Sequence, residues 1–489
     1  MGLFSRKKQA AAPAKRKYAP NPHLHSRSAG FSSSNTARLL GGWETTSHTI
    51  DFYLQQELRE LRARSRKMVR ANPYGKRFIS TIKANVVGPQ GVGVQSQSMM
   101  RGQLDTPANA AIESAFKDWG SKNCDKHGRL TWIDMQNLAI TSAAQDGEFL
   151  IRLWRSGRNG LQLEIVDPEL LDVEKNTTVK GGGEIRLGVQ YNSSGKRTRY
   201  HFKRKSHPVH GGYDNYDRYS LPANEFIHGF INEWPDQSRG TPWMHASLER
   251  SKHLEKYEEA AIVKARSTAA TMAVLRSPPG DQAYEGDDEY GDGVTLDQYE
   301  AGTIKDIGDR EITNIDSDYP HQMYSAFVKA HLQGIASGLG ISYHSLSGDL
   351  EGVNYSSIRA GVLEDREVFK GLQNWFIRSL VQPVFEDWLS MSLMHGVIRI
   401  GTRPLARPTE EYMAAHYQGR RWSWVDPQKD GAANKLAIDN NLKSRSQIMR
   451  EQGDDPESVF LEIKSERELM DRLGIKTAEQ EALENADTN

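Results

Sequence analysis

The chain has 489 residues, of which 37% are hydrophobic and 26% are charged, and its formal net charge is zero. This length allows two or three domains, or one large elaborated domain. We expect a soluble protein, because no window reaches the ~18 consecutive apolar residues of a membrane span and the start lacks the apolar segment of a secretory signal. The single cysteine, Cys124, excludes an internal disulfide framework and a Cys-based zinc site, and it predicts a reducing, cytoplasmic environment.

The net charge of zero conceals a division along the chain. Residues 1–86 contain 17 Lys and Arg against 4 Asp and Glu, a net charge of +13, so the remainder carries −13. Residues 1–45 are also rich in Ser, Ala, Pro and Asn, and such a polar segment cannot bury enough surface to offset its ordering entropy. We therefore expect residues 1–45 to be a disordered basic arm. It either keeps the chain in solution or contacts nucleic acid or an acidic partner.

A basic amphipathic helix is predicted over Asp51–Val69, and a second helix follows the helix-breaking pair Asn72-Pro73. A solvated face explains the basic side of the first helix most simply. Contact with phosphate is the alternative, because Lys and Arg bind phosphate without sequence-specific geometry. The candidates for nucleic-acid contact are Arg62, Arg66, Lys67 and Arg70. The glycines of Asn85–Val94 follow a helix and enter a strand, the reverse of the order in a nucleotide-binding loop, so no nucleotide site is predicted.

The pattern changes from helix to strand near Gly147. Residues 108–145 favour helix, and period-two alternation then predicts strands, with a hairpin turn at Asn192–Gly195. The expected strands cover residues 148–154, 161–166, 185–191, 196–202 and 226–231. An antiparallel sheet packed against helices is expected, which is an α+β fold class.

One cluster along the chain resembles a metal site, and it consists of His201, His207, His210, Asp214 and Asp217. Its spacing matches neither a helical His pair nor a known hydrolase motif. Surface histidines in a loop are the simpler explanation, because no rigid element would hold the ligand geometry. The alternative is a metal-dependent nuclease, which predicts binding of a divalent metal and loss of cleavage after His→Ala changes.

A long helix and an acidic segment come next. Thr241 as N-cap and Pro242 as first residue predict a helix that runs unbroken to Leu275, about 50 Å long. Small residues fill its second half and favour close packing, either against copies of the chain or within one subunit. Residues 277–300 are acidic without any Lys or Arg, and they indicate a solvated loop or a docking surface rather than an EF-hand. A short strand pair is expected at 302–307 and 311–315.

The most informative stretch is Ile335–Leu363. A helix ends there at Gly338 and Gly340, and a polar loop follows. Asn354 is a suitable N-cap for the next helix, which Pro383 is expected to interrupt. Nothing in the loop is arranged as a catalytic pair. Further helices are predicted over residues 429–441, 447–450 and 457–473.

Several phrases of the sequence resemble, in their order along the chain, those of the lambda-type phage portal proteins. They are Arg70–Asn72 with Asn85–Gly88, Asp146–Leu150, Gln237–Pro242, Ile335–Gly340 with Leu346–Asp349, Asn354–Arg359 and Gln373, Trp424–Pro427, and Arg450–Asp454. The resemblance extends over about residues 62–474. It implies a phage portal fold, and it divides the chain into an α/β wing (46–240), a stem helix (241–276), a small clip (277–318), a second stem helix (319–343), a tunnel loop and wing helix (344–400), and a helical crown with the C-terminal tail (401–489).

The resemblance also implies roles for particular residues. The tunnel loop facing DNA would contain Ser345, Ser347, Asp349, Glu351 and Asn354. The clip would dock partners through the carboxylates of Asp287, Asp288, Glu289 and Asp292.

The function that the resemblance implies is a ring of twelve copies at one vertex of the capsid, through which double-stranded DNA is packaged and later ejected. The expected partners are further copies of the chain, DNA, terminase, head-completion or connector proteins, and the major capsid or scaffold protein, with no membrane. The expected location is the virion, after assembly in the host cytoplasm. No cofactor and no enzymatic activity are expected, because the chain lacks the Gly-x4-Gly-Lys-[Ser/Thr] loop that an ATP-driven motor needs. The alternatives are the nuclease above and another head–tail adaptor ring, which the size of the chain disfavours.

Overall fold

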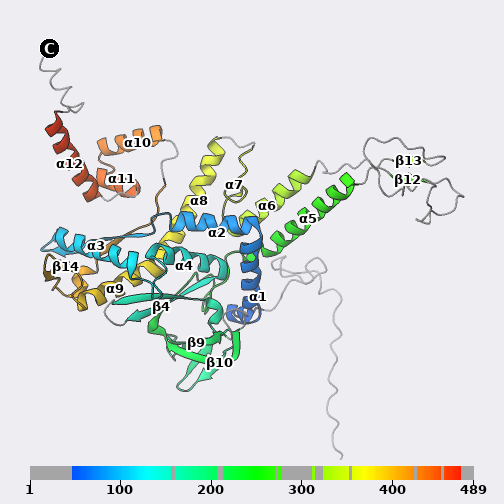
Figure 1. Cartoon of the computed structure of the whole chain (residues 1–489), viewed down its shortest axis with the longest axis horizontal. Coiled ribbons are helices and arrows are strands. Elements are labelled where there is room, and N and C mark those ends of the chain that lie inside the picture. The colour runs from blue at the N-terminus through cyan, green and yellow to red at the C-terminus, as the bar shows by residue number, and fades with distance from the viewer. Residues whose placement is uncertain are drawn as a thin grey trace, which may run out of the picture. The chain divides into compact units, whose positions relative to one another are not determined.

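The computed structural model describes residues 47–155, 160–205, 213–270, 274–276, 311–313, 323–351, 355–422, 427–452 and 456–474. The chain divides into residues 1–49 and a unit of residues 50–489, and the second unit combines helices with antiparallel sheets (Figure 1). The expected basic arm, the acidic segment with Asp287, Asp288, Glu289 and Asp292, and the expected strand 302–307 lie outside the described residues.

Four helices precede the sheets: α1 (Ile50–Ala71), α2 (Pro73–Val86), α3 (Thr106–Lys122) and α4 (Trp132–Asp146). The predicted break between the first two is confirmed. Asn72 accepts hydrogen bonds from the backbone N–H groups of Tyr74 and Gly75 at 2.9 and 3.3 Å, so it caps α2, and Pro73 occupies the first turn, where no N–H is needed.

Two antiparallel sheets stand in place of the single predicted sheet. One has the order β11 (Phe226–Phe230), β4 (Glu148–Arg155), β5 (Leu161–Val166). The other is a meander in the order β10 (Tyr213–Pro222), β9 (Arg197–Lys205), β8 (Val189–Tyr191), β7 (Gly183–Arg186), β6 (Thr177–Val179). The strand expected over 185–191 is divided into β7 and β8, because the chain turns at Leu187 and Gly188, which both have positive φ. The predicted hairpin at Asn192–Gly195 is confirmed between β8 and β9.

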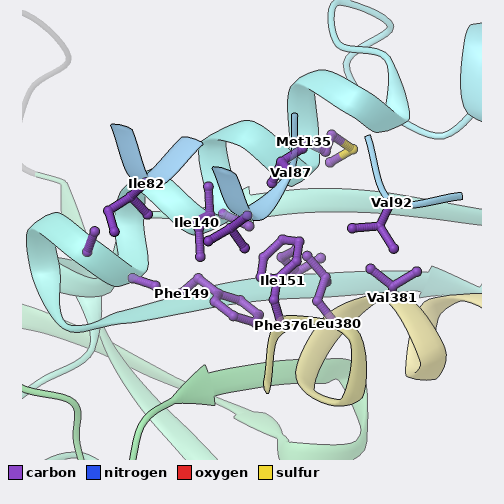
Figure 2. Packing of buried hydrophobic residues seen from close by; sticks show 14 of the residues in the cluster. Ile82, Val87, Val92, Met135, Ile140, Phe149, Ile151, Phe376, Leu380 and Val381 are labelled. Carbon is purple, nitrogen blue, oxygen red and sulfur yellow. The ribbon is translucent and has the colours of Figure 1, made fainter. Parts of the chain in front are cut away.

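The two faces of β4 explain how the sheets and helices pack. Phe149, Ile151 and Leu153 belong to the main hydrophobic cluster, whereas Leu150 belongs to a second cluster with residues of the five-stranded sheet. Successive side chains of a strand point to opposite faces, so β4 is covered on both sides. Figure 2 shows the main cluster, in which side chains from α2, α4, β4 and the helix after residue 376 meet.

The helix α5 (Leu248–Ala270) begins later than predicted. Thr241 is not its N-cap: the Thr241 hydroxyl donates to Glu233 at 3.1 Å, and a 3-10 turn at His245–Ser247 precedes the helix. The backbone N–H of Trp243 donates to the carbonyl of Ala144 at 3.1 Å, so a tertiary contact with the end of α4 holds this segment out of the helix. With 23 residues α5 is about 35 Å long, not about 50 Å.

The helix α6 (Tyr324–Leu339) lies beside α5 (Figure 1). Ser247 Oγ donates to the carbonyl of Ile335 at 3.0 Å, and the rings of Tyr257 and Phe327 are 4.6 Å apart. The predicted end of this helix is confirmed, since Gly340 adopts φ +67° directly after Leu339.

The prediction that Pro383 interrupts the following helix is wrong. α8 (Tyr355–Phe376), a π-helical turn (Ile377–Val381) and α9 (Gln382–Met394) form one continuous helical segment. The N–H of Gln382 donates to the carbonyl of Ile377, five residues earlier, so the hydrogen-bond register changes just before the proline. Pro383 then falls in a first turn, where its missing N–H costs little.

The C-terminal part contains the three predicted helices, as α10 (Pro427–Asp439), α11 (Arg445–Gln452) and α12 (Pro456–Leu473). Pairing of β1 (Gly93–Ser96) with β16 (Ala415–Gln418) joins it to the N-terminal half. The remaining strand pairs are β2 (Met99–Met100) with β3 (Gln103–Leu104), β12 (Val274–Arg276) with β13 (Glu311–Thr313), and β14 (Arg399–Ile400) with β15 (Arg403–Pro404). Among the helices described, none is long and apolar enough to cross a membrane.

Candidate functional site

The α6–α8 loop, residues 340–351, is held against α8 by one buried carboxylate. Ser342 caps a short helix, α7 (Tyr343–Ser347), by accepting from the Ser345 N–H at 3.3 Å. Asp365 on α8 accepts from the Ser342 N–H at 2.8 Å, from the Ser342 hydroxyl at 2.7 Å and from the Ser345 hydroxyl at 2.5 Å. Arg77 on α2 donates to the carbonyl of Ser345 at 3.2 Å. The loop therefore has a fixed base.

The outer half of this loop is organised around Asp349. The Tyr343 hydroxyl donates to its carboxylate at 2.8 Å, and the Glu351 N–H donates to it at 2.9 Å. These two hydrogen bonds hold the pKa of Asp349 below its ordinary value, so the carboxylate is charged at neutral pH. Lys329 on α6 lies 4.0 Å from it. Leu350 and Glu351 are exposed at the end of the described part of the loop.

The predicted loop residues are brought together, but with different surroundings. Ser345 is directed to Asp365, and Ser347 Oγ donates to the carbonyl of Tyr343, so both hydroxyls are used within the chain. Asp349 is one-third exposed, and the Glu351 side chain makes no hydrogen bond or ion pair within the described residues. Asn354 lies outside them. Among the described residues of this loop, the carboxylates that reach the surface are therefore those of Asp349 and Glu351.

The four basic residues of α1 that were candidates for nucleic-acid contact differ in their burial and in their ion pairs. Arg62 is 1% exposed and donates to Glu148 at 2.7 Å, so the expectation that it contacts nucleic acid is wrong. Arg66 donates to Asp146 and Asp167 at 2.7 and 2.6 Å. Lys67 and Arg70 are exposed and make no ion pair with any described residue. Of the four, Lys67 and Arg70 are therefore the two whose charge is unpaired within the described residues.

The partner of Arg62 is the centre of a buried ionic junction that sequence reasoning missed. Glu148 at the start of β4 also accepts from Arg239 Nη2 at 2.6 Å, from His228 Nε2 at 3.0 Å and from the Gly240 N–H at 3.0 Å. The guanidinium of Arg239 donates further to the carbonyls of Leu187 and Pro168, at 2.9 and 3.0 Å. We call Arg62, Glu148, His228 and Arg239 the Glu148 junction. It joins α1, both sheets and the segment before α5.

The charges within the Glu148 junction follow from its burial. Burial alone would raise the pKa of Glu148, but the guanidiniums of Arg239 and Arg62 hold it well below its ordinary value. Burial lowers the pKa of His228 to about 4, although the neighbouring Glu148 acts in the opposite sense. At neutral pH the junction therefore contains one carboxylate, two guanidiniums and a neutral histidine. Because all four side chains are at most 1% exposed, the junction is structural and not a surface for ligands.

The histidine cluster is not assembled within the described residues. His201 on β9 contacts Gln190 at 3.1 Å, and Asp217 pairs with Arg204 at 2.7 Å. His207 and His210 lie outside the described residues, as does the side chain of Asp214. In the part of the chain that is described, no three His, Cys, Asp or Glu residues are placed to hold a metal ion.

Several of the phrases that carry the family resemblance meet at junctions inside the fold. Asp146–Leu150 and Gln237–Pro242 contribute Glu148 and Arg239, and a Cβ on Gly147 would lie 2.4 Å from the carbonyl carbon of Thr241. Gln373 donates to the carbonyls of Asn85 and Arg420, at 2.8 and 2.9 Å. These phrases thus specify contacts between distant segments. No rule of local spacing could have paired Glu148 with Arg239, 91 residues away.

Comparison with known proteins agrees with the resemblance. The model of the lambda family of phage portal proteins matches residues 36–373. The chain is 33% identical over 473 residues to the probable portal protein of Halomonas phage phiHAP-1, which covers 93% of this chain and 89% of that protein. It is 22% identical over 484 residues to portal protein B of Escherichia phage lambda, covering 88% and 87%. A solved structure, the neck of a native gene transfer agent particle with C12 symmetry, contains a chain with 12% identity and a TM-score of 0.43, covering 82% of this chain and 94% of that one. With a family match over more than half of its length and a relative of 33% identity along most of it, this chain belongs to the lambda family of phage portal proteins.

Proposed function

We propose that this chain assembles into a closed ring, with twelve copies, at one vertex of a phage capsid, and that double-stranded DNA passes through the ring during packaging and ejection. Membership of the portal family is the observation that carries the proposal. In this proposal the ring is a virion component that does no chemistry, and an ATP-hydrolysing terminase supplies the energy.

In this proposal, successive segments of the chain have different roles in the ring. The paired helices α5 and α6 serve as the stem, and the segment between them, residues 277–318, serves as the clip. The α6–α8 loop faces the channel. Its base is fixed by Asp365, and the carboxylates of the partly exposed Asp349 and the exposed Glu351 would repel phosphate and so let DNA slide. The two sheets with α1–α4 form the wing, and α10–α12 form the crown.

In this proposal the clip docks terminase during packaging and head-completion proteins afterwards, and the outer surface contacts the major capsid or scaffold protein. Carboxylates without basic neighbours, at Asp287, Asp288, Glu289 and Asp292, supply charge for such docking. Replacing these four by Asn or Gln should leave rings intact but lower the fraction of phage particles that contain DNA. The matched control replaces Glu462, Glu466 and Asp471 on α12 together with Glu410, which removes the same charge elsewhere.

The first test is the mass and shape of the purified protein, by light scattering and negative-stain imaging in the presence and absence of scaffold protein. Rings of about a dozen subunits with a central hole are expected. A particle that stays monomeric or dimeric in both conditions contradicts the proposal. A monomer that also binds Mn²⁺ and cuts DNA would favour a nuclease instead.

A further inference from the structure

An open groove lies between the end of α9 and the segment that follows β15. Its volume is about 600 Å³, and its lining includes the apolar side chains of Leu393, Met394, Leu405 and Pro408. The backbone N–H of Leu405 donates to the carbonyl of Ile398 at 3.1 Å, which folds the hairpin β14–β15 back beside the end of α9. One wall of the groove is therefore fixed by the backbone. We call this hollow the Met394 groove.

Arg407 joins this groove to a second hairpin, β2–β3. Arg407 lines the groove, and its Nη1 donates to the carbonyl of Met99 at 2.8 Å while its Nη2 donates to Asp105. Met99 begins the hairpin, and Asp105 directly follows it. In addition, β14 lies beside α3, the helix that starts after the hairpin (Figure 1). The two hairpins therefore border one surface.

The side chains around the Met394 groove expose apolar surface. Met394 is 74% exposed, and the other large apolar side chains there are between 44% and 56% exposed. They are Met99, Met100 and Leu104 of β2–β3, Val397, and Ile400 of β14. Both hairpins lie well inside the described ranges 47–155 and 355–422, so the segments that flank them in the sequence are described too. Contiguous apolar patches on protein surfaces mark binding sites, and methionine adapts its flexible side chain to the shape of a partner.

Arginines surround this apolar surface. Residues 99–104 and 390–409 contain no Asp, Glu or Lys, and their arginines are Arg101, Arg399, Arg403 and Arg407. The first three are exposed, whereas Arg407 pairs with Asp105 and, at 3.4 Å, with Glu411. Glu410 is the remaining carboxylate next to these segments in the sequence, so three exposed arginines stand against one carboxylate. Because unlike charges across an interface select the partner, this rim favours a partner that carries carboxylates.

We propose that the Met394 groove docks an amphipathic helix of another virion protein, and that carboxylates of this helix contact Arg101, Arg399 and Arg403. Such a helix presents a stripe of apolar side chains with charged side chains beside it, which matches an apolar groove with a basic rim. The apolar contact supplies affinity, and the charges select the partner. That the partner belongs to the virion rests on the proposed function.

The first test compares methionine oxidation in free, assembled rings and in complete phage particles. Dilute hydrogen peroxide converts exposed methionines to the sulfoxide, and mass spectrometry measures the rate at each position. Met394 should react readily in free rings and at least about fivefold more slowly in particles, relative to the partly buried Met470 on α12. Equal relative rates in the two samples overturn the proposal. Slow reaction already in free rings would show that a second copy covers the groove, which also overturns it.

The second test examines the chemistry of the partner with two labelled synthetic helices. One has leucines on one face and glutamates beside them, and the other has lysines in place of the glutamates. Anisotropy with free, assembled rings should show that the glutamate helix binds at least about tenfold more tightly. Met394→Ser should weaken its binding by about tenfold, because the lost contact buries a large apolar side chain. Arg101→Gln with Arg403→Gln should weaken it by about threefold or more and lower its salt dependence.

Matched controls change exposed residues of other elements, and they should leave the binding of both helices unchanged. They are Leu442→Ser, between α10 and α11, and Arg266→Gln on α5 with Arg472→Gln on α12. Equal binding of the two helices, or no loss of binding in the groove variants, refutes the groove as a docking site.

Light scattering on the same samples separates this proposal from the proposed function. Groove variants that no longer form rings would assign the surface to a second copy and overturn the proposal. Rings that bind neither helix refute the groove but not the ring. A wild-type protein that forms no ring refutes the proposed function, and the binding of the two helices to it still decides whether the groove is a docking site.

Discussion

Replacing Glu148 by Gln tests whether the Glu148 junction holds α1, the two sheets and the segment before α5 together. The change keeps the shape of the side chain but removes the negative charge between Arg62 and Arg239, which are 1% and 0% exposed. Removing one partner of a buried ion pair leaves an uncompensated charge and costs about 3–5 kcal/mol. Because folded proteins are stable by only about 5–15 kcal/mol, this loss is large.

The assay is urea unfolding followed by tryptophan fluorescence, in which the midpoint should fall while the slope of the transition stays the same. The matched control is Glu60→Gln on α1. Glu60 pairs with Arg64 at 3.0 Å, but these side chains are 69% and 67% exposed. A surface pair of this kind contributes about 0–1 kcal/mol, so the control should change the midpoint little.

A third variant tests the cause. Arg62→Met combined with Glu148→Gln removes one of the two uncompensated guanidiniums, so it should be less destabilised than the two single changes predict together. If Glu148→Gln loses no more stability than Glu60→Gln, the argument from buried charge is refuted. The junction would then tolerate a neutral centre.

Three further predictions follow from other contacts. Burial lowers the pKa of His228 from 6.5 to about 4, so the unfolded chain takes up the proton first as the pH falls. The contribution of His228 to the free energy of unfolding is therefore fully present above pH 6.5. It decreases by roughly 3 kcal/mol as the pH falls towards 4. His228→Gln should flatten this part of a pH series of urea unfolding, whereas the exposed His253→Gln should not, and equal slopes in both would contradict the assignment. Gly338→Ala should destabilise the α5–α6 pair by about 1–3 kcal/mol, since its Cβ would lie 2.4 Å from Ser247 Oγ and displace the hydrogen bond to Ile335. Gly361→Ala on α8 meets no atom within 4 Å and should instead stabilise by about 0.5–1 kcal/mol, so thermal melting that ranks the two glycine variants the other way refutes both estimates. Asp365→Ala should release the base of the α6–α8 loop, and hydrogen exchange at residues 342–349 should then be faster than in Asp365→Asn, which keeps an acceptor; identical protection in both would show that other contacts fix the loop.

Much of the local structure was determined by the sequence itself. The break at Asn72-Pro73, the hairpin at Asn192–Gly195 and the helix end at Gly340 depend on backbone preferences of a few adjacent residues, and all three predictions are confirmed. The α+β class follows from the change of hydrophobic period near Gly147. The family was evident from short phrases in a fixed order. The roles of the basic arm, the acidic segment and Asn354 stay predictions, since those residues lie outside the described parts of the chain.

Only the tertiary structure decided which long-range contacts override these local preferences. Thr241 and Pro242 have the residue types of a helix start, yet the contact of Trp243 with Ala144 delays α5 to Leu248. Pro383 ought to break a helix, yet a π turn accommodates it. Arg62 and Arg421 are both arginines in basic stretches, and sequence alone cannot distinguish them. One lies against Glu148, 86 residues away, and the other has no carboxylate partner among the described residues, because the free energy of a charge depends on the groups that folding places around it.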